Sequence, residues 1–177
     1  MRRSISASFS AGWFLWLTSD RFPCNSSSGD NTPTHNPHPL TAMAKRSVIE
    51  SLHVNAQMVA SNEEVFTEDF TVHGIYFGEG DPEAGGQHWN FTRSLGDDDE
   101  GVCTVKEIQE FTVHEGITSF EMSRTSVVCD FDSDAAQRTG VRRLTIAYEI
   151  DDATWTDLAS QAKLVFTDMA HFKLTPT

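Results

Sequence analysis

The segment from Glu115 to Phe166 constrains the fold of this 177-residue chain most, because its apolar spacing changes from a strand period to a helical period. From Leu144 to Ile150 apolar residues alternate without a fault, which is typical of a strand with one buried face. Asp151 and Asp152 suit a helix N-terminus, and apolar residues then recur near the helical period. These residues are Trp155, Leu158, Ala162, Val165 and Phe166. A helix with one apolar face needs a sheet to pack on.

The other strands are predicted where aromatic and β-branched residues gather or alternate: 48–56, 70–77, 88–93, 101–113, 117–122 and 126–131. The polar, acidic segment 61–68 predicts a loop or short turn. A short helical turn is predicted over 134–139, capped by Asp132 or Ser133 and ended by Gly140. The sequence therefore predicts an α+β fold. A single domain would hold an antiparallel β-sheet of about six strands packed against a C-terminal helix, with the helical turn before the last strand.

Residues 1–42 differ in composition from the rest, since Asn25 to Pro39 is rich in Ser, Asn, Pro and His and has no apolar period. An orderly pattern begins at Met43, which fits a misassigned start or a dispensable tail. The sequence therefore predicts a disordered tail over 1–42 and a folded domain over 43–177. A cytoplasmic location is expected, with export as the alternative if residues 1–25 act as a signal. No apolar run approaches the roughly 18 residues that span a bilayer.

Two patterns resemble metal sites, and neither is complete. Asp130–Asp134 (DFDSD) begins like a calcium loop, which also needs glycine at its sixth position and glutamate at its twelfth. Those positions hold Ala135 and Val141, so helix capping explains the aspartates better. Three histidines lie in or directly beside predicted strands: His73, His88 and His114. Because they lack a short-range pair, the sequence predicts no metal site, although they would meet if the strands aligned them.

Catalytic and cofactor motifs are equally weak. Cys103 and Cys129 fall in predicted strands, where buried free thiols are common, and no G-x-S-x-G elbow is present. Gly74, Gly78 and Gly80 have the wrong spacing for a dinucleotide loop, and no helix is predicted after them. We therefore expect no catalytic residue and no cofactor, and the chain is predicted not to be an enzyme.

Charge constrains the partner. The chain has 26 acidic and 13 basic residues, for a net charge of −13, which would repel a phosphate backbone and attract a basic protein. Four adjacent acidic residues, Asp97, Asp98, Asp99 and Glu100, predict a solvated hairpin tip. Such a tip is either simply solvated or binds a partner, for example by entering the phosphate-binding cleft of a basic nuclease. These four residues are the predicted partner-binding residues.

A series of strand and turn features runs from Gln87 to Phe166. It comprises HWNFTR ending at Arg93, the acidic turn, a long strand, the Gly116–Ile117 turn before SFEMSRTSVVCDF, the Ala135–Ala136 turn closed by Gly140, the alternating strand, and the helix ending in Leu164-Val165-Phe166. This order resembles the immunity protein 10 family of bacterial polymorphic toxin systems. The resemblance implies a small α+β protein that binds and neutralises a cognate toxin encoded beside it. It implies no active-site residues, and the tail over 1–42 departs from the family's compact pattern.

Two other functions stay open: a non-catalytic adaptor for another protein partner, and a small enzyme or ligand binder. A deep pocket with convergent His, Asp or Cys side chains would favour the enzyme or ligand binder, whereas a flat acidic face would favour the immunity protein. Because 115–166 is scaffold in this interpretation, partner contacts are expected in the loops 78–86 and 97–101.

Overall fold

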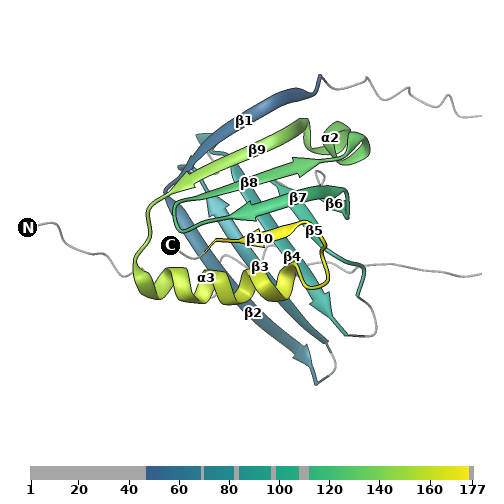
Figure 1. Cartoon of the computed structure of the whole chain (residues 1–177), viewed down its shortest axis with the longest axis vertical. Helices are drawn as coiled ribbons and strands as arrows, with labels where there is room; N and C mark the ends of the chain where they lie inside the picture. Colours follow the sequence, from purple (N-terminus) through teal and green to yellow (C-terminus); the bar gives the residue numbers. More distant parts are fainter. Residues whose placement is uncertain (1–46, 69, 82–83, 97–98, 108–111, 176–177) are drawn as a thin grey trace, which may run out of the picture. The chain divides into compact units, whose positions relative to one another are not determined.

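The computed structural model describes residues 47–68, 70–81, 84–96, 99–107 and 112–175. These residues form ten strands and two helices (Figure 1). The α+β fold with a C-terminal helix, predicted from the sequence, is confirmed. The predicted boundary at Met43 and the predicted tail over 1–42 lie outside the described residues.

The first sheet contains the strands with the clearest sequence patterns. Its order is β1 (Ile49–Ala56), β9 (Val141–Tyr148), β8 (Ser126–Phe131), β7 (Ile117–Met122) and β10 (Phe172–Leu174). The outer pairs, β1 with β9 and β10 with β7, are parallel, and the inner pairs are antiparallel. Strand β10 is not among the predicted strands, because three residues are too few for an alternating pattern to be recognised.

The second sheet is an antiparallel meander. Its order is β2 (Met58–Thr67), β3 (Phe70–Gly78), β4 (His88–Leu95), β5 (Cys103–Lys106) and β6 (Thr112–His114). The strand predicted over 101–113 is thus two strands, β5 and β6, which pair with each other. The loop predicted over 61–68 is wrong, because most of these residues continue β2. Strand β2 is at the edge of the second sheet and, among the described strands, pairs only with β3. Many side chains of such an edge strand face solvent, so a polar sequence suits it.

The structure has two five-stranded sheets where the sequence predicted one sheet of about six strands. The chain passes from the first sheet to the second at Gln57, the single residue between β1 and β2. There the N–H of Gln57 donates to the carbonyl oxygen of Gly78 at 2.8 Å and joins β2 to the end of β3. Side-chain alternation is the same in both sheets, so it predicts a strand without indicating the sheet to which that strand belongs.

Aromatic side chains from the two sheets meet in one core. Trp89 of β4 stacks on Phe131 of β8, with ring centroids 5.9 Å apart. Phe91 of β4 meets Phe120 of β7 edge to face at 5.1 Å. All four are buried, with at most 3% of their surface exposed. Offset and edge-to-face ring contacts of this kind add to the stabilisation that comes from burying apolar area.

Both helices begin at aspartates that the sequence predicted as caps. The side chain of Asp132 accepts two backbone N–H groups at the start of α2 (Ser133–Thr139), and Gly140 ends this helix with a φ of 74°. The side chain of Asp151 accepts one backbone N–H at the start of α3 (Asp152–Val165). Each cap satisfies N–H groups that have no partner within the helix.

Helix α3 packs on β2, β3 and β4 of the second sheet (Figure 1). It buries Leu158, Ala162 and Val165, three of the apolar residues that predicted its inner face. A polar contact fixes it further, since Nδ1 of His73 on β3 donates to Oε1 of Gln161 at 2.9 Å. The end of α3 therefore lies beside the strands that lead to the acidic turn.

Candidate partner-binding surface

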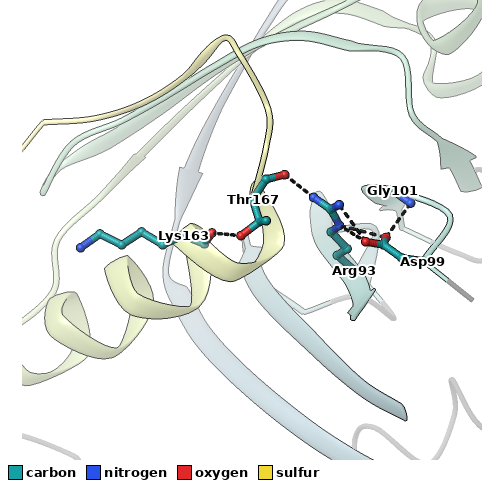
Figure 2. Close-up of polar contacts among 5 residues, drawn as sticks. All are labelled: Arg93, Asp99, Gly101, Lys163 and Thr167. Carbon is teal, nitrogen blue, oxygen red and sulfur yellow. Dashed lines mark hydrogen bonds and ion pairs between the residues drawn. The ribbon is translucent and has the colours of Figure 1, made fainter. Parts of the chain in front are cut away.

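The acidic turn after β4 is anchored by one of its own carboxylates (Figure 2). Nε of Arg93 donates to Oδ1 and Oδ2 of Asp99 at 2.9 Å each, and Nη2 donates to Oδ2 at 2.7 Å. The Asp99 carboxylate also accepts the backbone N–H of Gly101 at 2.9 Å. The flat fork of a guanidinium matches a carboxylate, which makes such charged hydrogen bonds strong and directional.

Arg93 also links this turn to the end of α3 (Figure 2). Its Nη1 donates to the carbonyl oxygen of Thr167, and the Thr167 hydroxyl donates to the carbonyl oxygen of Lys163 in the last helical turn at 2.9 Å. The side chain of Arg93 is 13% exposed and that of Asp99 is 25% exposed. We name Arg93, Asp99 and Thr167 the arginine clamp.

The clamp keeps both of its side chains charged. The hydrogen bonds from Arg93 hold the pKa of Asp99 below its usual value, and the same bonds raise the pKa of Arg93. The charge of each side chain stabilises the ionised form of the other side chain. Of the four residues predicted to bind a partner, Asp99 therefore holds the turn in place through contacts within the protein.

The other three predicted residues have different positions. Asp97 and Asp98 lie outside the described residues. The side chain of Glu100 is 63% exposed, and its Oε2 lies 3.7 Å from Nδ1 of His114, which is 47% exposed. An ion pair this exposed contributes little to stability. Glu100 is therefore accessible to a partner.

The described ends of the loop over 78–86, which was also expected to meet a partner, are joined by backbone contacts. The N–H of Glu79 donates to the carbonyl oxygen of Gln87 at 2.8 Å, and the N–H of Gly86 donates to that of Asp81 at 3.0 Å. A Cβ at Gly86 would lie 1.9 Å from the carbonyl oxygen of Glu79, so this approach requires glycine. The loop end is thus fixed by the backbone around Gly86.

The three histidines considered as metal ligands make separate contacts. His73 faces α3 through its bond to Gln161, whereas the ring of His88 bonds to the Tyr76 hydroxyl. His88 and its neighbour Trp89 point to opposite faces of β4, and Trp89 belongs to the core. His88 therefore lies on the outer face of the second sheet, away from His73. Within the ranges that the structure describes, no three metal-binding side chains converge.

A polar pair on this outer face was not identified from the sequence. The Tyr76 hydroxyl is hydrogen-bonded to Nδ1 of His88, and burial lowers the pKa of His88 while raising that of Tyr76. Both side chains are therefore neutral at neutral pH. Nε2 of His88 and Oδ1 of Asn90 are buried, and neither has a hydrogen-bond partner among the described residues. Only the strand register, which sets Tyr76 opposite Asn90, brings this group together.

The two cysteines in the described part of the chain are free and protonated. Burial raises the pKa of Cys103 to about 11 and holds that of Cys129 well above its usual value. A thiol needs its thiolate form to act as a nucleophile, so neither cysteine is activated at neutral pH.

An open groove lies between the turn after β6 and helix α2, where His114, Asp132 and Arg138 are among the lining residues. The Asp132 carboxylate accepts the N–H groups that begin α2, so it is engaged in capping. The His114 ring lies beside Glu100, at the acidic turn. Of these lining groups, Asp132 is therefore engaged in the fold, and His114 makes an exposed contact with Glu100.

The far end of the β2–β3 hairpin exposes apolar side chains in the segment that the sequence predicted as a loop. Val65 is 62% exposed and Phe66 is 46% exposed. The rings of Phe66 and Phe70 lie 5.3 Å apart. The strand register shifts between Val65 and Thr67, so Phe66 sits at a β-bulge, a feature that redirects side chains. We name Val65, Phe66 and Phe70 the apolar hairpin end.

The apolar hairpin end and the acidic turn lie at the same end of the second sheet. Thr71, next to Phe70, pairs with Leu95, the last residue of β4, and the acidic turn follows directly. Figure 1 shows the ends of β2 and β3 extending beyond α3. One surface can therefore present apolar and acidic groups together.

Comparisons with protein-family models, with curated proteins and with solved structures found no match. Among the described residues, no helix has both the length and the apolar character needed to cross a membrane.

Proposed function

We propose that this protein is an immunity protein, which binds a cognate toxin domain in the bacterial cytoplasm and blocks it by direct contact. In this proposal the protein acts without catalysis and without a cofactor. The resemblance over Gln87 to Phe166 supports the proposal, and so does the net charge of −13. That charge attracts a basic toxin domain, such as a nuclease, and disfavours direct binding to nucleic acid.

The arginine clamp is the observation on which the proposal depends most. It ties the turn that carries Glu100 to β4 and to the end of α3. Asp99 and Gly101, which flank Glu100, are held in place before binding, so less conformational entropy is lost at Glu100 when the partner arrives. An accessible carboxylate on such a turn suits the electrostatic capture of a basic surface.

Co-expression of the full chain with the toxin encoded beside its gene tests the proposal. We expect the chain to restore growth and to copurify with the toxin domain as a one-to-one complex. Failure to restore growth, with the toxin shown to be active in the same cells, would contradict the proposal.

The second candidate is a non-catalytic adaptor for a different protein. The apolar hairpin end suits it as well as it suits the immunity protein, because exposed apolar groups of this kind fit a protein partner of either sort. A one-to-one complex with the neighbouring toxin would decide for the immunity protein. Absence of binding to that toxin would leave the adaptor as the remaining candidate.

A further inference from the structure

We propose that the apolar hairpin end is the surface that contacts the toxin, with Phe66 as its main anchor and nearby carboxylates as its charged rim. This inference rests on the proposed function and deepens it. The partner surface is defined by its chemistry: a basic face with an apolar depression that receives the Phe66 ring.

Exposure sets this surface apart. Three large apolar side chains are conspicuously exposed in the described part of the chain: Ile49, Val65 and Phe66. Two of them are neighbours in sequence, and the ring of Phe70 extends the same area. Aromatic side chains that gain full burial in a partner's pocket dominate the free energy of many protein interfaces. Phe66 is the residue best placed for that role.

The geometry of the hairpin presents Phe66 outward. The bulge between Val65 and Thr67 interrupts the ladder at Phe66, so this residue is released from the regular pairing of β2 with β3. Strand β2 is at the edge of the second sheet, which leaves one side of it without a neighbouring strand of that sheet. The anchor is therefore carried by a strand that pairs with β3 and lies at an open edge of the sheet.

Charge defines the occupant. Between Arg46 and Arg93 the sequence contains no lysine or arginine, while acidic residues recur, including Glu63, Glu64 and Glu68 beside the apolar hairpin end. The side chain of Glu63 is 51% exposed. Because the acidic turn lies at the same end of the sheet, the rim around the apolar groups is negative. A basic partner complements this rim and is steered toward it.

The same charge argues against a second copy of this chain as the occupant. Two copies meeting at this surface would bring like charges together across the interface, and each chain carries a net charge of −13. Like charges directly opposite each other destabilise an interface. The toxin domain is therefore the occupant to which we commit.

The experiment compares single variants of the full chain for binding to the neighbouring toxin domain, made inactive by mutation of its own active site. The variants are Phe66→Ser, Val65→Ser and, as a matched control, Ile49→Ser. Ile49 is 49% exposed, close to the 46% of Phe66, but it lies on β1 of the other sheet. By isothermal titration we expect Phe66→Ser to weaken the complex about 30-fold or more, and Ile49→Ser by less than about threefold. Val65→Ser should lie between them.

Hydrogen exchange on the wild-type complex provides a readout that needs no variant. Backbone amides around Phe66 should exchange more slowly with the toxin bound than without it, whereas those around Ile49 should not change. Circular dichroism and thermal unfolding of each variant would show that a loss of affinity does not come from a loss of fold.

Each outcome has a distinct meaning. If the wild type binds the toxin but Phe66→Ser binds equally well and the amides are unchanged, this surface is refuted while the proposed function stands. If the wild type does not bind the toxin, both ideas fail. Sedimentation that shows a dimer of the wild type, lost in Phe66→Ser with toxin binding intact, would assign the surface to a second copy and overturn the inference.

Discussion

The acidic turn and the apolar hairpin end lie at the same end of one sheet, yet their side chains are used in different ways. In the turn, Asp99 is bound by Arg93 and by a backbone N–H, so a charged residue stabilises the fold. In the hairpin, Val65 and Phe66 are exposed although they are apolar. Residue type alone therefore does not show how a side chain is used in either place: the Asp99 carboxylate is bound within the protein, and two apolar side chains face solvent.

The largest effect on stability is expected for Arg93→Ala. The change leaves the Asp99 carboxylate and the Thr167 carbonyl without their donor, in a site where the arginine is only 13% exposed. Asp99 retains some contact with solvent. The loss in the free energy of unfolding should therefore be smaller here than at a fully buried ion pair that loses one partner. We therefore expect a loss of about 2–3 kcal/mol in the free energy of unfolding, measured by urea denaturation.

Arg93→Lys is the control for this prediction. Lysine keeps the positive charge but cannot form the two-pronged contact with Asp99, so its loss of stability should be intermediate. If Arg93→Ala unfolds at the same urea concentration and with the same slope as the wild type, the clamp does not stabilise the fold and the contrast with the hairpin disappears.

The pH dependence of stability should identify Asp99 as the titrating member of the clamp. Its pKa in the folded protein is below its usual value, so its contribution is fully present above about pH 4, the ordinary carboxyl range. The contribution should be lost as the pH falls through the lowered pKa. We expect the stability difference between the wild type and Asp99→Asn to be constant from pH 7 to about pH 5 and to shrink at lower pH. A difference that is the same at every pH would show that the charge of Asp99 is not responsible.

Much of the fold could be predicted from the sequence because it depends on local patterns. The alternation in β9 and the apolar face of α3 are strong periodic signals, and the caps at Asp132 and Asp151 follow from local backbone chemistry. The bend at Gln57 and the division into two sheets could not be predicted, because strand pairing joins residues far apart in the chain. The polar edge strand β2 was missed for a related reason: its hydrogen bonds to β3 do not depend on its side chains.

The candidate site was only partly predictable. An acidic run is visible in sequence, but its division into a bound Asp99 and an accessible Glu100 depends on where Arg93 and Gly101 lie in space. Val65 and Phe66 were not singled out, because they fall in the polar segment 61–68, which predicted a loop, and two adjacent apolar residues form no periodic pattern. The signal that was available is the absence of lysine and arginine between Arg46 and Arg93, which leaves the hairpin with acidic side chains that no neighbouring basic residue in the sequence offsets.

A smaller effect is expected for Glu100→Lys, and it should appear in the kinetics of binding. Reversing an exposed charge on the acidic turn should slow association with a basic toxin domain by about three- to tenfold at low salt, with little change near 0.5 M salt. Glu50→Lys is a matched control, since that side chain is 80% exposed and lies on β1 of the other sheet. Equal slowing by both changes, measured by stopped-flow mixing, would mean that only net charge matters and that the turn has no special place in the encounter.

The smallest effect on stability is expected at the hairpin, where Phe66→Ser should lower the free energy of unfolding by about 1 kcal/mol. Phe66 is 46% exposed and its described ring contact is with Phe70, so about half of its surface is already in solvent in the folded protein. Measured by urea denaturation beside Arg93→Ala, this change separates the two regions: one residue matters to the fold and the other to the partner. A loss of 2 kcal/mol or more for Phe66→Ser would place the ring among the residues that hold β2 to β3. The hairpin end would then resemble the clamp, and its apolar surface would no longer need a partner to explain it.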